Sequence, residues 1–141
     1  MSEQDSLNKL HGMLIRHEGL RLKPYPCSAG KITIGVGRNL EDNGISEAEA
    51  MIMLDNDIHR VHEEASREFS WFSTLSLDRQ NVVLSMLFNL GMPRFKKFAK
   101  VISALEIKDF ERAASEMLNS QWAAQVGRRA TELAELMRTG Q

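Results

Sequence analysis

The chain has 141 residues and a mass of 16.0 kDa, which corresponds to one domain or to one domain with two lobes. Hydrophobic residues make up 43% and charged residues 26%, a balance that is ordinary for a soluble globular protein and excludes an intrinsically disordered chain. The net charge of −1 argues against a dedicated nucleic-acid binder, because such proteins usually carry a strong basic excess.

Turn-forming residues are concentrated in the first third of the chain. Apolar residues at helical spacing predict a first helix over residues 7–16 that ends near His17. Pro24 and Pro26 exclude helix in the following segment, and alternation with β-branched residues predicts a strand over residues 31–37. A sheet this small is marginal by itself, so we expect it to depend on neighbouring helices.

The remainder of the chain is expected to be helical. Ser46 and Glu49 have capping-box spacing and predict a long helix that ends at about residues 64–69. Ser76 is the expected N-cap of a second strong helix over residues 77–90. Three further helices are predicted over residues 95–105, 110–118 and 121–137.

The histidines do not form a metal-binding cluster, and other features of the sequence argue against a secreted or membrane-inserted chain. His59 and His62 lie three residues apart on the long helix, but a metal needs three or four converging ligands and no second cluster is present, so we expect a solvated helix face and no cofactor. The one cysteine, Cys27, permits no internal disulfide, which is typical of a reducing compartment. No apolar segment is long enough to cross a bilayer, and the first ten residues lack the apolar core of a secretory signal.

A local basic cluster and four aromatic residues each allow two interpretations. The cluster is either a solvated face or a patch that steers the protein to an anionic polymer. It consists of Arg94, Lys96, Lys97 and Lys100. The aromatic residues could stack on sugars, but at this number we expect them in the core or joining the lobes. They are Phe69, Trp71, Phe72 and Trp122.

The most specific segment of the chain begins at Glu18, at the end of the first predicted helix. The C-terminal end of a helix carries a partial negative charge, which disfavours an ionised carboxylate. A carboxyl group that stays partly protonated near neutral pH is a candidate general acid. The alternative, a solvent-exposed glutamate with no chemical role, remains open on spacing alone.

The same segment resembles the active-site signature of the T-even phage lysozymes, glycoside hydrolase family 24. In that pattern a Glu follows the first helix, an Asp or Cys comes nine residues later, and a Thr in a Thr-x-Gly-x-Gly strand comes six residues after that. Glu18, Cys27 and Thr33 keep this spacing, and Gly35 and Gly37 complete the strand pattern.

The resemblance extends over nearly the whole chain. Residues 46–57 resemble the family's long inter-lobe helix, and residues 88–91 resemble the Phe-x-x-Gly ending of its buried central helix. Residues 119–122 and 127–130 resemble its Trp-to-Arg C-terminal segment. The implied fold is α+β and mostly helical, with a small β-containing lobe at about residues 13–49 and a helical lobe at about 52–141 on the two sides of a cleft. The N-terminal helix is expected to pack on the helical lobe.

The implied activity is that of a muramidase, which hydrolyses the β-1,4 bond between N-acetylmuramic acid and N-acetylglucosamine in peptidoglycan. Glu18 would be the general acid, and Thr33 would hold the attacking water. Arg129 would take the place of the arginine that pairs with the catalytic glutamate. Asn89 and Phe88 would contact substrate from the helical lobe.

Two positions depart from the commoner pattern of the family. Cys27 occupies the second catalytic position, which is often an aspartate, and a neutral thiol is a poor substitute for a carboxylate as base or nucleophile. Whether Cys27 acts as base, as nucleophile or only in packing stays open, and with it the inverting or retaining outcome. Arg38 stands where some members have a cleft histidine, and the short connection after it predicts a small first lobe.

Two other functions remain as alternatives. The first is a non-catalytic glycan-binding module of a phage tail or cell-wall machine, which Cys27 favours. The second is a chitinase-like or chitosanase-like glycosidase. As a muramidase, the protein would be a monomer that accumulates in a host cytoplasm. It would reach the periplasmic cell wall through a lesion made by a separate membrane-permeabilising protein.

Overall fold

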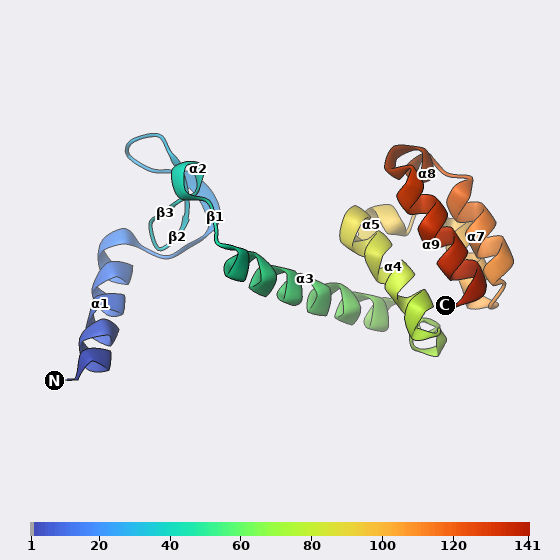
Figure 1. Ribbon diagram of the computed structural model, residues 1–141, viewed down its shortest axis with the longest axis horizontal. Helices are drawn as coiled ribbons and strands as arrows, with labels where there is room; N and C mark the ends of the chain where they lie inside the picture. Colours follow the sequence, from blue (N-terminus) through green and yellow to red (C-terminus); the bar gives the residue numbers. More distant parts are fainter. Residues whose placement is uncertain (1) are drawn as a thin grey trace. The chain divides into compact units, whose positions relative to one another are not determined.

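The structure is a computed structural model that describes residues 2–141. It is mostly helical with one small antiparallel sheet, so the predicted α+β class is confirmed (Figure 1). Residues up to Ile52 form one compact unit and Met53–Gln141 form a second. The chain passes from one to the other within helix α3 (Glu47–Glu68).

Helix α1 (Glu3–Glu18) begins earlier than residue 7, where the sequence placed its start. The reason is a capping box: the Ser2 hydroxyl accepts a hydrogen bond from the Asp5 amide at 3.1 Å, and the Asp5 carboxylate accepts one from the Ser2 amide at 3.3 Å. The helix ends at Gly19, whose φ of 79° breaks the helical path. Glu18 is therefore the last helical residue.

The first unit contains an antiparallel sheet in the order β1 (Arg21–Pro26), β2 (Ile32–Gly35), β3 (Arg38–Asn39). The strand predicted over residues 31–37 is present but shorter, because Gly35 and Gly37 have positive φ angles of 69° and 68° and turn the chain back on itself. The residues before and after this turn pair as β2 and β3. The third strand was not predicted.

A short helix α2 (Leu40–Asn43) follows the sheet, and then α3 begins. The predicted capping box of α3 is confirmed: the Ser46 amide donates to Glu49 at 2.8 Å, and the Glu49 amide donates to the Ser46 hydroxyl at 3.1 Å. The Glu49 carboxylate also accepts hydrogen bonds from both terminal nitrogens of Arg38, at 3.0 and 2.8 Å. This bidentate pair fixes the end of the sheet to the first turn of α3.

The second unit is helical. After a 3-10 turn (Phe72–Thr74), α4 (Leu77–Leu90) has the predicted bounds, and the Ser76 hydroxyl caps it by accepting from the Arg79 amide at 3.2 Å. The residues expected to face inward on α4 are all buried. They are Val82, Val83, Met86, Leu87 and Leu90.

Two of the three remaining predicted helices are each divided in two. Gly127 has a φ of 59° and separates the predicted helix over residues 121–137 into two parts. The predicted helix over residues 95–105 is interrupted at Lys96–Phe98, and the one over residues 110–118 is confirmed. The observed elements are α5 (Met92–Phe95), α6 (Ala99–Glu106), α7 (Phe110–Leu118), α8 (Gln121–Val126) and α9 (Arg128–Thr139).

The core of this second unit lies where α4, α6, α7 and α9 meet. Helix α7 packs against α6 and α9, and α4 packs against α9 (Figure 1). Small residues such as Ala114 and Ala130 let these helices approach closely, and Phe95 is fully buried in the same core. The four aromatic residues considered for sugar stacking are buried, which confirms their expected place in the core.

Candidate active site

Glu18 lies at the C-terminal end of α1, and its side chain lies against the turn between β2 and β3. A Cβ atom placed on Gly37 would be 2.9 Å from the Oε2 of Glu18 and 3.2 Å from its Cδ and Cγ. The carboxyl group thus occupies space that any side chain at Gly37 would take. Glu18 itself is exposed, so its carboxyl group is open to a ligand as well as in contact with the turn.

Cys27 and Thr33 lie close together on either side of the turn between β1 and β2. The Cys27 amide donates to the Lys31 carbonyl at 2.9 Å, and the Thr33 hydroxyl donates to that same carbonyl, also at 2.9 Å. Thr33 is on the central strand, where it pairs with Tyr25 and Asn39, and is only 3% exposed. Cys27 is half-buried.

The turn also changes the acidity of the thiol. Hydrogen bonds from the backbone of Lys31 and then of Ala29 lower the pKa of Cys27, and a weaker hydrogen bond with the Thr33 side chain acts in the same direction. These groups stabilise the thiolate. Partial burial raises the pKa, but its effect is smaller than that of either backbone hydrogen bond. The Cys27 thiol therefore loses its proton at lower pH than an ordinary cysteine thiol does.

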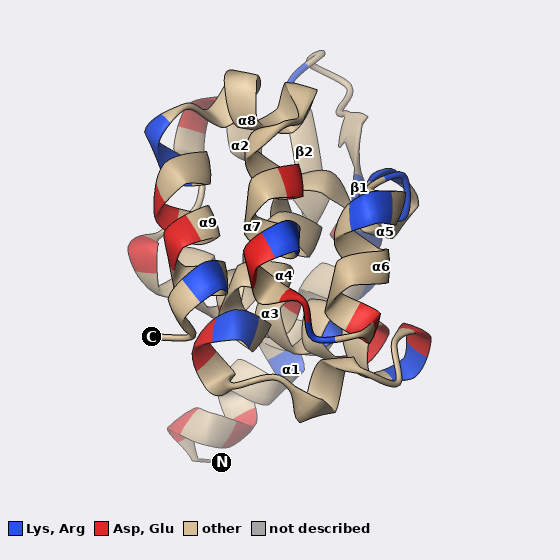
Figure 2. Cartoon of the chain, turned by 90° about the vertical axis from the view of Figure 1, so that its right-hand side faces the viewer, with Lys and Arg blue, Asp and Glu red and all other residues tan. Residues whose placement is uncertain are grey.

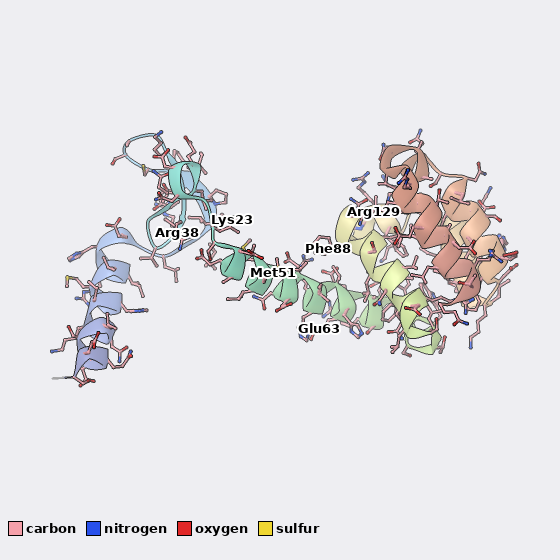
Figure 3. All side chains as sticks on the ribbon, viewed as in Figure 1. Lys23, Arg38, Met51, Glu63, Phe88 and Arg129 are labelled. Atoms are coloured by element: carbon pink, nitrogen blue, oxygen red, sulfur yellow. The ribbon has the colours of Figure 1, made fainter. Side chains whose placement is uncertain are left out.

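Phe88 and Arg129 come together in the helical unit, on α4 and α9 (Figure 3). Both line a mostly apolar hollow of about 280 Å³, together with residues of α3 and Ser85. The guanidinium of Arg129 donates one hydrogen bond to the Ser85 hydroxyl at 3.2 Å. Phe88 is 48% exposed, so its ring and the Arg129 head are both available to a ligand.

Asn89 is adjacent to Phe88 in sequence but has a different neighbour. Its Oδ1 accepts a hydrogen bond at 3.0 Å from the indole nitrogen of Trp122, which is buried on α8. Asn89 does not line the hollow that Phe88 and Arg129 share. The three residues expected to contact substrate from the helical unit thus fall into two groups.

The basic cluster borders a hollow of about 570 Å³ on the side of α5, where Figure 2 shows basic residues in blue. Arg94, Lys97 and Lys100 line it, whereas Lys96 forms an ion pair with Glu68. All four side chains are exposed, so the cluster is a solvated face that also borders this hollow.

The two histidines considered for metal binding are engaged elsewhere. His59 lies 3.2 Å from Glu63, and the ring of His62 packs edge-on against Phe72. Among residues 2–141, no three His, Cys, Asp or Glu side chains are grouped so that they could hold a metal ion. Over the same residues, no helix is both long and apolar enough to span a bilayer.

Sequence reasoning missed three neighbours of the site residues. Gly37 was recognised only as part of a glycine pattern, and its contact with Glu18 could not be seen because it joins a helix end to a hairpin turn. Trp122 donates a hydrogen bond to Asn89, 33 residues away, and Ser85 accepts one from Arg129, 44 residues away. Ser85 gave no signal of its own in the sequence, because it is one of several polar residues on α4.

One known protein family matches most of the chain. The family model described as phage lysozyme matches residues 15–138, a range that includes all six site residues. The chain belongs to the phage lysozyme family. It is 30% identical over 134 residues to the endolysin of Acyrthosiphon pisum secondary endosymbiont phage 1, covering 92% of this chain and 88% of that protein.

Two further relatives show how widely this family occurs. The chain is 24% identical over 163 residues to the probable T4-type lysozyme 2 of Dictyostelium discoideum, covering 95% of this chain and 96% of that protein. It is 31% identical over 113 residues to the endolysin of Salmonella phage P22, covering 74% and 75%. The phage lysozyme family thus accounts for nearly the full length of the chain, as its sequence motif suggested.

Proposed function

We propose that this phage lysozyme family member is a muramidase that hydrolyses the β-1,4 bond between N-acetylmuramic acid and N-acetylglucosamine in peptidoglycan. The observation that carries the proposal is the placement of Glu18, Cys27 and Thr33 around one small sheet within the region that matches the family. Its relatives named endolysin and lysozyme support a glycoside hydrolase rather than a binding module.

In the proposed reaction, Glu18 acts as the general acid. Its carboxyl proton moves to the glycosidic oxygen as the bond from that oxygen to the anomeric carbon breaks, so the leaving sugar departs as an alcohol. Positive charge develops on the anomeric carbon and ring oxygen in the transition state. The exposed carboxyl group at the end of α1 is accessible for this proton transfer.

Cys27 and Thr33 act on the opposite side of the reaction. In an inverting path, the Cys27 thiolate takes a proton from the water that attacks the anomeric carbon; in a retaining path, its sulfur attacks that carbon first and water then releases the sugar. The lowered pKa of Cys27 supports either role. The Thr33 hydroxyl donates a hydrogen bond to the Lys31 carbonyl, so its oxygen lone pairs remain free to accept a hydrogen bond from the water.

In the helical unit, we propose that Phe88 and Asn89 contact the glycan strand and that Arg129 pairs with Glu18. The Arg129 guanidinium has one hydrogen-bond partner within its own unit, Ser85, and guanidinium carries five N–H donors. Pairing with Glu18 would orient the carboxyl group. The packing of the N-terminal helix on the helical lobe, the lobe boundaries and a cleft between the lobes stay predictions.

The proposed substrate fixes where the protein acts. Peptidoglycan strands are the partner, and the site of action is the periplasmic cell wall after release from the host cytoplasm. We propose that release depends on a separate membrane-permeabilising protein and that the enzyme acts as a monomer.

A lysis assay with product analysis tests this proposal. Purified protein is added to permeabilised Gram-negative cells and to isolated peptidoglycan, and the soluble products are separated and analysed by mass spectrometry. We expect falling turbidity and fragments with N-acetylmuramic acid at the new reducing end. Binding without soluble products would instead indicate a glycan-binding module, and cleavage of chitin or chitosan in place of peptidoglycan would indicate one of the other glycosidases.

A further inference from the structure

The contact between Glu18 and Gly37 has a consequence for the reaction that the motif by itself does not state. The Glu18 carboxyl group is at the end of a flexible side chain on an exposed helix end, and no hydrogen bond or ion pair from the described residues holds it. The bare backbone of Gly37 is the surface on which it rests, since a Cβ there would lie 2.9 Å from Oε2.

We propose that Gly37 is a positioning residue, and that the space left by its missing side chain holds the Glu18 carboxyl group where the reaction needs it. The proposal rests on the proposed function in one respect, which is that Glu18 is the general acid. Non-bonded carbon and oxygen atoms prefer separations of about 3.5 Å or more, so a methyl group at Gly37 would displace Oε2 by roughly half an ångström or more.

This displacement has little effect on folding and a large effect on chemistry. The atoms that must move belong to the far end of a flexible side chain, and none belongs to the backbone. A proton donor, in contrast, has to lie within hydrogen-bond reach of the oxygen that it protonates, and misplacement by ~1 Å can cost ~10²-fold in rate. An added methyl group is therefore expected to separate activity from stability.

A backbone explanation for the glycine also has to be tested, because Gly37 has a φ of 68°, which disfavours any L side chain. Gly35 provides a matched control. It lies in the same turn with a φ of 69°, and a Cβ there would meet no atom within 4 Å. Gly35→Ala and Gly37→Ala thus introduce the same residue at the same backbone angle, and only Gly37→Ala meets Glu18.

The experiment compares these two variants with the wild type in thermal unfolding, in kcat and KM on soluble peptidoglycan fragments, and in the ¹³C shift of the Glu18 carboxyl carbon. That resonance is assigned with Glu18→Gln. We expect the two variants to lose similar thermal stability. We expect Gly37→Ala to have a kcat lower than that of Gly35→Ala by ~10–100-fold, with KM within a few-fold, and to shift the Glu18 resonance. Equal kcat values and an unshifted resonance would overturn the proposal.

A second measurement needs neither a variant nor activity. In the wild type, nuclear Overhauser effects are expected between the γ protons of Glu18 and the α protons of Gly37, and their absence would overturn the contact even if Gly37→Ala fails to fold. The two proposals can also fail separately. If Glu18→Gln remains active, the assignment of the acid is wrong while the Overhauser effects still report the contact; if it is inactive but Gly35→Ala and Gly37→Ala behave alike, only the positioning role is wrong.

Discussion

Asn89 and Trp122 are joined by a hydrogen bond of 3.0 Å from the indole nitrogen to the Asn89 Oδ1, which links α4 to α8. The indole ring is buried, whereas Asn89 is on the surface. The amide oxygen therefore satisfies a donor that would otherwise lie inside the protein without a partner. Asn89 therefore stabilises the fold, in addition to any contact that it makes with substrate.

Replacing Asn89 with Ala is expected to lower the free energy of unfolding by ~1–3 kcal/mol, which is the usual cost of leaving a buried donor unsatisfied. Urea unfolding followed by tryptophan fluorescence measures it. Asn81→Ala is the control, because Asn81 is an exposed asparagine on the same helix. If the two variants unfold at the same urea concentration, the hydrogen bond contributes nothing measurable to stability.

Cys27 is expected to react with iodoacetamide at lower pH than the same cysteine in the urea-unfolded chain. The reason is that the backbone of Lys31 and Ala29 lowers the pKa of the folded thiol, and the thiolate is the reactive form. The measurement is the alkylation rate as a function of pH, folded and unfolded. Coinciding midpoints would contradict the lowered pKa.

The same residue gives a test of its role in activity. Cys27→Ser should lose much of the lytic activity, whereas Cys27→Asp should retain part of it, because a carboxylate can act as base or nucleophile where a hydroxyl cannot. Substrate fragments should slow the alkylation of the wild type. Wild-type lysis by Cys27→Ser would show that the thiol only packs.

Glu49 is expected to make folding sensitive to acid. Its hydrogen bonds with Arg38, and then with Ser46, lower its pKa from 4.5 to about 2, so the folded-state pKa lies below the unfolded one. The stabilisation is therefore fully present above pH 4.5 and is lost as the pH falls from there toward about 2. Melting temperatures of wild type and Glu49→Gln should differ at pH 6 and converge toward pH 2.

Glu47→Gln serves as the control for this pH series, because Glu47 lies on the same first turn of α3 and takes part in no ion pair among residues 2–141. It should follow the wild-type curve. A Glu49→Gln curve that stays parallel to the wild type down to pH 2 would mean that the Arg38 pair does not titrate as described.

Arg79 fastens the C-terminal end of α9 to α4. Its side chain donates to the Met137 carbonyl at 2.7 Å and the Arg138 carbonyl at 2.9 Å, and its guanidinium carbon lies 3.6 Å from the centre of the Phe110 ring. Burial lowers its pKa, although the group stays charged. Arg79→Met should cost ~1–3 kcal/mol, the range for hydrogen bonds to a charged group.

Thermal unfolding measures the effect of Arg79→Met, with Arg112→Met as the matched control. Arg112 is an exposed arginine on α7, and its side chain forms no hydrogen bond or ion pair with another described residue. An equal loss of stability in the two variants would contradict the role of Arg79 as a cap for α9.

Local signals in the sequence predicted much of this fold. The capping pairs Ser46–Glu49 and Ser76–Arg79 are separated by three residues, so the starts of α3 and α4 could be placed from the sequence. The sequence also contains Gly127, but its role as a break between two helices depends on a φ of 59°, which the sequence pattern does not specify.

The arrangement of the site was less predictable because it depends on contacts between elements. The motif selected Glu18, Cys27 and Thr33, and these three residues lie around one sheet. Arg38 pairs with Glu49, which is 11 residues away, and Glu18 contacts Gly37, which is 19 residues away. Both contacts depend on turns whose geometry the sequence does not specify. A family motif supplies spacing, whereas these contacts require the folded chain.

In the proposed reaction, everything depends on Glu18 as the donor of the proton that breaks the glycosidic bond. The most direct measurement is the rate at which wild type and Glu18→Gln release soluble fragments from purified peptidoglycan, with circular dichroism and thermal unfolding to show that both are folded. Gln has nearly the same shape but cannot donate a proton as an acid, so we expect a loss of at least ~10²-fold in rate with folding intact. A folded Glu18→Gln variant that releases fragments within a few-fold of the wild-type rate would contradict it.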